Sequence, residues 1–161
     1  MTKINPLKIL VVEDNQYMRT IVREILKGAG IIDVREAHDG ADAFEILQQY
    51  PADIAIVDFN MQPVDGIDFT RTLRRSPPQL NPMMPVIMIT GHSERSRVEE
   101  ARDAGVTEFV VKPMTAAALL HRINTVVMHP RDFVKSGKFV GPERRRRRAG
   151  YEGEERRAAR D

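Results

Sequence analysis

Polar residues with chemically useful side chains follow the short apolar runs of this sequence. The clearest case is Asp58, which comes directly after the run Ile54 to Val57. An ionised carboxylate beside a buried strand is costly unless a charged or hydrogen-bonding group meets it. The residues that follow such runs are Glu13, Asp14, Asp58, Thr90 and Lys112.

These residue types suit the transfer of a phosphoryl group to a carboxylate. Three neighbouring carboxylates repel one another, and a hard divalent cation with oxygen ligands, such as Mg²⁺, relieves that repulsion. Lys112 can pair with an incoming phosphoryl group and Thr90 can donate a hydrogen bond to it. Each residue alone could equally be a helix cap, a turn residue or a solvated charge. Only the occurrence of all five residues at strand ends, in this order, indicates phosphoryl transfer.

Alternating strand and helix patterns predict an α/β fold of the (βα)5 type. Five apolar runs, between about Lys8 and Val111, are separated by segments with helical spacing, and a fifth helix extends to Met128. Such alternation predicts a doubly wound, five-stranded parallel sheet with helices on both faces. In an open sheet of this kind, sites form beyond the carboxyl ends of the strands, where the polar residues stand.

Two segments are expected to be less regular. The stretch from Ser76 to Pro85 contains four prolines, which remove backbone donors, and it is expected to be a long loop without regular structure. The fourth helix, near Ser93 to Ala104, offers little apolar surface beyond Val98 and Ala101. We expect that helix to be loosely held.

Four segments together resemble the receiver domain of two-component response regulators. They read ILVVEDN, VDFNMQPVDG, MITG and FVVKP. The resemblance covers about residues 7–128 and implies the CheY-like, flavodoxin-like strand order 2-1-3-4-5. Residues 1–128 are therefore expected to form one receiver domain.

The resemblance also implies roles for individual residues. Asp58 would accept a phosphoryl group from a sensor histidine kinase or a phosphotransfer protein. Mg²⁺ would be held by Glu13, Asp14, Asp58 and the backbone carbonyl of Asn60. The protein would then be a phosphoacceptor that assists its own phosphorylation and dephosphorylation without being a conventional enzyme.

Signalling would follow from movement around the phosphoryl group. By the same resemblance, Thr90 and Lys112 sense that group, and Phe109 switches between outward and inward positions. From sequence alone, Phe109 is equally compatible with an ordinary half-buried strand residue. The output partner is expected on the face formed by the fourth helix, the fifth strand and the fifth helix.

Composition favours a cytoplasmic protein. With 42% hydrophobic and 30% charged residues the chain reads as soluble and globular, and no long apolar run predicts a membrane span. It contains no cysteine, which excludes disulfides, thiolate metal sites and thiol catalysis. The apolar start is also too short for a signal peptide.

A basic segment follows the fifth helix. Residues 129–161 carry a net charge of +5, including Arg144 to Arg148, against −3 for residues 1–128. We expect a disordered tail without a domain of its own, because runs of like charge repel. Docking on an acidic protein surface and binding to nucleic acid or an anionic membrane remain alternatives.

Competing functions also remain open. The chain could be a phosphate sink for a kinase, or a regulator that binds nucleic acid or an acidic partner through its tail. A haloacid-dehalogenase-like phosphotransferase would need a second acid where Asn60 stands. A nucleotide- or flavin-binding domain would need a glycine-rich loop after the first strand, and acids stand there instead.

Overall fold

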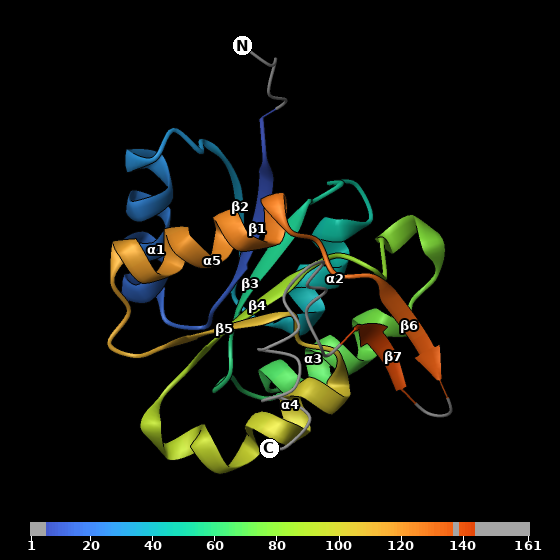
Figure 1. The fold of residues 1–161 in the computed structure, drawn as a ribbon. Helices are drawn as coiled ribbons and strands as arrows, with labels where there is room; N and C mark the ends of the chain where they lie inside the picture. Colours follow the sequence, from blue (N-terminus) through green and yellow to red (C-terminus); the bar gives the residue numbers. More distant parts are fainter. Residues whose placement is uncertain (1–5, 137–138, 144–161) are drawn as a thin grey trace.

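The fold is a five-stranded parallel sheet with helices on both faces (Figure 1). The computed structural model describes residues 6–136 and 139–143. The sheet has the order β2-β1-β3-β4-β5, which confirms the predicted order. Its strands are β1 (Lys8–Val12), β2 (Asp33–Ala37), β3 (Ile54–Asp58), β4 (Val86–Thr90) and β5 (Glu108–Val111).

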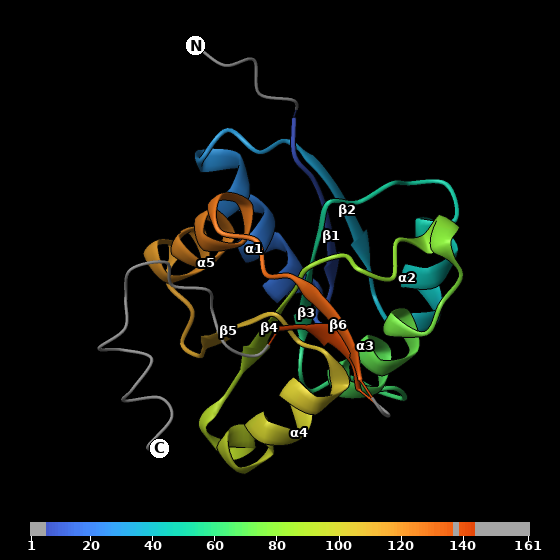
Figure 2. The same ribbon diagram turned by 45° about the vertical axis from the view of Figure 1, so that its right-hand side comes forward.

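Two helices cover one face of the sheet and three cover the other, as Figure 2 shows. The helices are α1 (Gln16–Gly28), α2 (Gly40–Leu47), α3 (Gly66–Arg74), α4 (Val98–Ala104) and α5 (Ala116–Met128). Alternate residues of β3 point to the two sides, so Ile56 packs with the helices α1 and α5 and Val57 packs with the others. Because both faces are covered, every residue of β3 and β4 is buried.

Four helices begin with a side-chain cap in the loop that precedes them. Asn15, Asp39, Asp65 and Thr115 each accept a hydrogen bond from the backbone N–H three residues later. Such caps satisfy donors that a helix leaves unpaired at its start. The caps set the residue at which each helix begins. They therefore help to position the polar residues in the loops at the carboxyl edge of the sheet.

Two expectations about local structure need correction. The segment Ser76 to Pro85 was expected to lack regular structure, yet Pro78–Leu80 forms a turn of 3-10 helix that ends at Asn81 with a φ of 55°. A proline is tolerated there because the first turn of a helix needs no backbone donor. The fourth helix is divided into a 3-10 segment, His92–Arg97, and the short α4.

Residues 129–136 and 139–143 do not form a free tail. They contain an antiparallel hairpin of β6 (Phe133–Ser136) and β7 (Phe139–Pro142), and β7 packs against α4 (Figure 1). The packing is close at Gly105 and Gly141, because a Cβ on Gly141 would lie 2.9 Å from the Cα of Gly105. The predicted boundary at residue 128 therefore needs refinement. Arg144 to Arg148 and the expected disorder lie outside the described residues.

A buried arginine joins the hairpin to the body of the protein. Arg74, at the end of α3, is 3% exposed and donates to the carbonyl oxygens of Gly105 (2.7 Å), Pro82 (2.8 Å) and Met84 (2.6 Å). The ring of Phe133 on β6 lies 4.9 Å from its guanidinium carbon. Burial lowers the pKa of Arg74 to about 9, so the side chain still carries its charge at neutral pH. α3, the loop before β4, the α4–β5 turn and the hairpin therefore meet at one residue.

Removing β7 is expected to destabilise the receiver body. From sequence, deletion of residues 136–161 should leave the domain intact. The hairpin changes that expectation, since deletion of β7 uncovers Gly105 and removes the strand that pairs with β6. A chain ending at residue 143 should unfold like the full-length protein, whereas one ending at residue 135 should lose about 2 kcal/mol. Urea denaturation of both chains measures the difference, and equal midpoints would contradict the packing role of β7.

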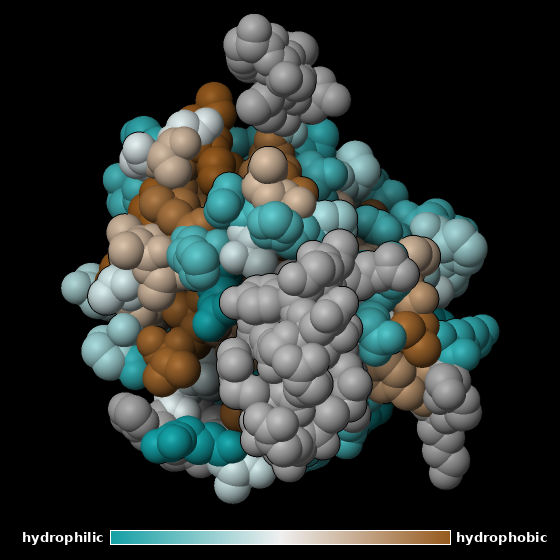
Figure 3. All heavy atoms as spheres, viewed as in Figure 1, coloured by the Kyte–Doolittle hydropathy of each residue, from teal (hydrophilic) through white to brown (hydrophobic). Residues whose placement is uncertain are grey.

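The described helices do not include a candidate membrane span. Within residues 6–136 and 139–143, none is both long enough and apolar enough to cross a bilayer. Exposed apolar side chains do occur near the ends of α1 and α5, among them Tyr17 and Met128. Figure 3 shows apolar surface on the side formed by these two helices.

Candidate functional site

Three carboxylates meet at the carboxyl edge of the sheet. β1 and β3 are neighbours in parallel register, with Val12 opposite Val57. The residues that follow these two positions are therefore brought together. Oxygen atoms of Glu13, Asp14 and Asp58 all lie within 4.8 Å of one another, and Glu13 and Asp58 are buried whereas Asp14 is exposed. The structure thus assembles the acidic cluster that the sequence predicts, in an arrangement that can hold a metal ion.

Lys112 supplies the positive charge beside Asp58. Its Nζ lies 2.9 Å from Oδ1 of Asp58, whose side chain is 4% exposed. Burial raises the pKa of Asp58 above its usual range, and the charge of Asp14 adds to this effect, while Lys112 and the backbone N–H of Asn60 oppose it. Lys112 therefore favours the ionised, nucleophilic form of Asp58.

Glu13 has one carboxylate oxygen without a protein partner. Its Oε2 accepts from the backbone N–H of Asn15 at 3.1 Å, while its Oε1 is buried and has no hydrogen-bond partner among the described residues. Burial, followed by the charge of Asp58, raises the pKa of Glu13 to about 7. A buried oxygen without a partner is costly. An oxygen-seeking cation bound by the cluster would supply the missing partner, so these residues fit a metal site.

The other predicted site residues lie around this cluster. Thr90 ends β4 next to Ile89, which pairs with Asp58 across the strands, and it is 4% exposed. Its carbonyl oxygen accepts from the backbone N–H of Lys112 at 2.7 Å, which joins the ends of β4 and β5. Asn60 is exposed two residues after Asp58, and its carbonyl remains a predicted ligand.

Phe109 lies on β5 at some distance along the sheet edge from the acids. It is half-buried and packs against the core on the α4 side of the sheet. The guanidinium carbon of Arg102 lies 6.0 Å from the centre of its ring. This position suits a ring that could move between core and solvent, and its switching role stays a prediction.

A family model decides between the candidate classes. The model of the response regulator receiver domain matches residues 9–124, which include β2 to β5 and all of β1 but its first residue. The chain belongs to the response regulator receiver family. It is accordingly a CheY-like receiver of two-component signalling, a system whose receivers work with histidine kinases or phosphotransfer proteins.

Individual relatives agree with this receiver assignment. The chain is 36% identical to the chemotaxis protein CheY-3 of Vibrio cholerae over 120 residues, which cover 74% of this chain and 91% of the relative. It is equally similar to the chemotaxis protein CheY of Pseudomonas aeruginosa, covering 95% of that protein. Among solved structures, CheY4 of Vibrio cholerae matches with a TM-score of 0.69 and 29% identity, over 76% of this chain and 99% of that one. The receiver domain of NtrX from Brucella abortus matches with a TM-score of 0.66 and 26% identity, over 75% and 99% of the two chains.

Gly66 is a residue of the receiver site that our sequence analysis missed. A Cβ there would lie 2.7 Å from the carbonyl oxygen of Asp58 and 2.9 Å from the side chain of Met88. The backbone N–H of Gly66 donates to the carbonyl of Phe59 at 2.9 Å. Only glycine lets α3 begin this close to the end of β3. The Asp65-Gly66 pair in the sequence could have indicated a helix that begins with a close backbone contact.

Replacing Gly66 with alanine should disturb the receiver site directly. The added methyl group would contact backbone atoms of β3, which cannot move without shifting Asp58. We expect a loss of about 1 to 3 kcal/mol in the free energy of unfolding. Gly28→Ala is the matched control, because no atom lies within 4 Å of its added methyl group. Urea denaturation of the two variants tests the difference, and a Gly66→Ala protein as stable as the control would contradict the close approach.

Arg97 is a second residue that the sequence did not single out. Its guanidinium carbon lies 5.0 Å from the ring of Phe59, the residue after Asp58. Its Nη1 lies 3.7 Å from the carboxylate of Asp65, and its Nε donates to Glu100 at 2.9 Å. The start of α4 is therefore connected to the loop that follows Asp58.

Proposed function

We propose that this receiver accepts a phosphoryl group on Asp58 from a histidine kinase or a phosphotransfer protein. The observation that carries the proposal is the pairing of buried Asp58 with Lys112 at 2.9 Å beside two further carboxylates. In the transfer, an oxygen of Asp58 forms a bond to phosphorus as the bond from phosphorus to the donor histidine nitrogen breaks. The acceptor side chain then carries about two negative charges instead of one.

The residues around Asp58 have separate tasks in this transfer. Lys112 keeps the attacking carboxylate ionised and then pairs with a phosphoryl oxygen as a point charge. The Thr90 hydroxyl is placed on the adjacent strand end, where it can donate to another phosphoryl oxygen. Glu13 and Asp14, with Asp58 and the carbonyl of Asn60, would hold Mg²⁺. The cation would screen the negative charge of the incoming phosphoryl group.

Intact-protein mass spectrometry tests the acceptor. The protein is incubated with Mg²⁺ and acetyl phosphate, and the phosphorylated fraction is measured. Wild type should gain a phosphoryl mass increment that disappears without Mg²⁺ and in Asp58→Asn. Asp53→Asn is the matched control, since Asp53 precedes the opposite end of the same strand and should leave the increment unchanged.

The alternative outcomes point to other conclusions. An increment that persists in Asp58→Asn would place the acceptor on another residue. A folded wild-type protein that binds Mg²⁺ but gains no increment from acetyl phosphate would next be incubated with kinases. Failure there as well would contradict the proposal.

We further propose that the phosphorylated receiver signals through altered protein contacts of α4, β5 and α5. Thr90 ends the strand beside Asp58, and together with Phe109 of β5 it lines a cavity on this face, which supports the route. A phosphate sink would show phosphorylation without any partner specific to the phosphorylated form. A nucleic-acid-binding regulator would show an affinity that falls steeply with salt and depends on Arg144 to Arg148.

A further inference from the structure

We propose that Arg97 is a positioning residue that holds the acceptor loop, residues 59–65, in the arrangement that binds Mg²⁺. The inference rests on the proposed function and deepens it, because this loop carries the Asn60 carbonyl that is predicted to bind the cation. Arg97 acts through Phe59 and Asp65, which lie at the two ends of the loop.

The acceptor loop has little regular structure of its own. Residues 60–64 belong to no helix or strand, and four of these five residues are exposed. Two backbone hydrogen bonds fix its ends. The N–H of Phe59 donates to the carbonyl of Ile89, and the N–H of Gly66 donates to the carbonyl of Phe59, both at 2.9 Å. Side-chain contacts must therefore position the part of the loop that includes Asn60.

Arg97 contacts both ends of this loop. Its guanidinium carbon lies 5.0 Å from the centre of the Phe59 ring, and its Nη1 lies 3.7 Å from one oxygen of Asp65. A guanidinium over an aromatic ring is attracted by the negative face of the ring. The other oxygen of Asp65 accepts from the backbone N–H of Asp68 at 2.9 Å and caps α3. One side chain at the start of α4 therefore holds the residue after Asp58 and the residue before α3.

Glu100 holds Arg97 in this position. Its two oxygens accept from Nε of Arg97 at 2.9 Å and from Nη2 at 3.1 Å, which leaves Nη1 facing Asp65. Hydrogen bonds from Arg97 also hold the pKa of Glu100 below its usual range, so this carboxylate stays ionised at neutral pH. A planar guanidinium can present its face to a ring and its edges to two carboxylates at once, which an ammonium group cannot do.

Loss of the Arg97 contacts should act on the loop more than on the fold. The Arg97 side chain is 42% exposed, whereas Phe59 is 4% exposed. Replacing Arg97 would therefore leave the core intact but would uncover the Phe59 ring. Because Asn60 directly follows Phe59, movement of that ring would displace the Asn60 carbonyl. The expected result is a more mobile loop and weaker Mg²⁺ binding.

Hydrogen exchange measured by NMR without Mg²⁺ tests the loop directly. The amides to follow are those of Asn60 and Gly66, which donate to the Asp58 carboxylate and to the Phe59 carbonyl. Full-length wild type is compared with Arg97→Met and Arg97→Lys. Isothermal titration calorimetry then measures the Mg²⁺ dissociation constant of each protein.

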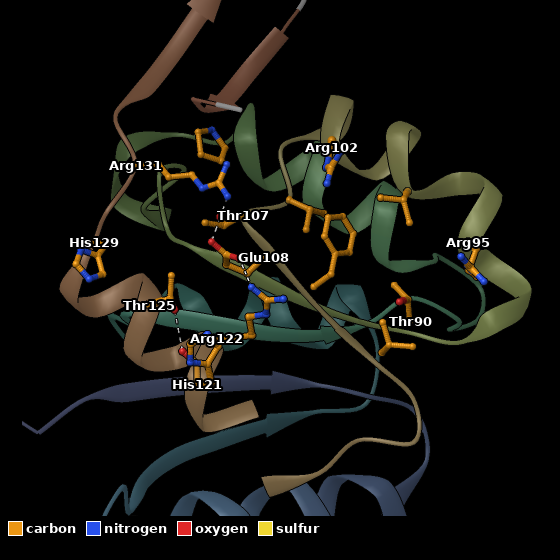
Figure 4. Close-up of a pocket in the computed structure, with 15 residues that line it drawn as sticks. Thr90, Arg95, Arg102, Thr107, Glu108, His121, Arg122, Thr125, His129 and Arg131 are labelled. Atoms are coloured by element: carbon orange, nitrogen blue, oxygen red, sulfur yellow. Dashed lines mark hydrogen bonds and ion pairs between the residues drawn. The ribbon is translucent and has the colours of Figure 1, made fainter. Parts of the chain in front are cut away.

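Arg102→Met is the matched control. Arg102 also pairs with a glutamate three residues away, Glu99, and its guanidinium carbon lies 6.0 Å from the centre of the Phe109 ring on β5. Figure 4 shows Arg102 beside the cavity lined by α4, β5 and α5, which Arg97 does not line. This variant removes the same charge and the same kind of pair without touching the acceptor loop. Its loop exchange and Mg²⁺ affinity should stay within about twofold of wild type.

We expect the two loop amides of Arg97→Met to exchange about three- to tenfold faster than in wild type, and Mg²⁺ to bind more weakly by a similar factor. Arg97→Lys should lie closer to Arg97→Met than to wild type. Phosphorylation by acetyl phosphate at low Mg²⁺ should slow by the same factor, and saturating Mg²⁺ should restore most of the rate. A merely destabilised protein would not show that restoration.

Three results would overturn the inference. The first is unchanged exchange and Mg²⁺ affinity in Arg97→Met. The second is full restoration by Arg97→Lys, because charge alone would then suffice. The third is an equal effect of Arg97→Met and Arg102→Met.

The same samples separate this inference from the proposed function. Normal phosphorylation of every variant with unchanged Mg²⁺ affinity would remove the role of Arg97 and leave Asp58 as the acceptor. Loop exchange and Mg²⁺ binding that depend on Arg97, in a wild type that gains no phosphoryl increment, would support the inference and count against the proposed function. A wild type that binds no Mg²⁺ would overturn both.

Discussion

The Arg74→Met protein is expected to lose about 4 kcal/mol in free energy of unfolding. The substitution leaves the buried carbonyl oxygens of Met84 and Gly105 and the partly buried one of Pro82 without the donor they now have. Hydrogen bonds to a charged donor contribute about 1.5 to 3 kcal/mol each, and the methionine side chain recovers part of that loss by packing. Urea denaturation at neutral pH measures the change.

Neighbouring variants show whether the loss belongs to this side chain. Arg75→Met removes the same charge from the next, exposed residue and should change stability by less than about 0.5 kcal/mol. Arg74→Lys should restore less than half of the loss, because an ammonium group cannot reach three separated carbonyls as a planar guanidinium does. Equal effects at residues 74 and 75 would show that Arg74 does not join these segments.

In the absence of a divalent cation, wild type should become less stable relative to Glu13→Gln as the pH rises from 5 to 8. The folded protein holds the proton of Glu13 up to a pKa of about 7, whereas the unfolded chain releases it near the ordinary glutamate pKa of 4.5. Stability from this group is therefore fully present below pH 4.5 and is lost as the pH rises through 7. The shift corresponds to a change of roughly 2 to 3 kcal/mol in that pH range.

Two further samples identify the cause of this pH dependence. Saturating Mg²⁺ should flatten it, because a bound cation stabilises the carboxylate. Asp58→Asn should weaken it, since the charge of Asp58 is the second largest cause of the raised pKa. Denaturation across the pH series measures all three proteins, and parallel curves for wild type and Glu13→Gln would mean that Glu13 titrates as an ordinary exposed acid.

The sequence alone was sufficient to predict the sheet and most of the site. Strands buried on both faces are continuous apolar runs, so their positions could be recognised without knowing what packs on them. Once the strands are parallel, the residue after each run must lie at the same edge of the sheet. That geometry brings Glu13, Asp14, Asp58 and Lys112 together, as the structure confirms.

Sequence analysis could not identify residues whose importance depends on distant neighbours. Arg74 and Arg75 are adjacent and identical in type, yet only Arg74 is buried, because the carbonyls around it come from segments up to 31 residues away. Gly66 was missed for a related reason. A side chain at Gly66 would collide with the end of β3. The sequence of the helix α3 itself does not indicate that contact.

The C-terminal segment shows the same limit most clearly. Its charge and few apolar residues predict a tail, because a hairpin of two four-residue strands has too little surface to fold alone. Packing on α4 supplies the missing surface, so the hairpin exists only in the context of the receiver. The sequence determined the strands and the chemistry at their ends, which follow from local pattern and chain order. The tertiary structure decided which arginine is buried, where the C-terminal hairpin packs and which arginines pair with Glu108. Those outcomes depend on contacts between residues far apart in the chain.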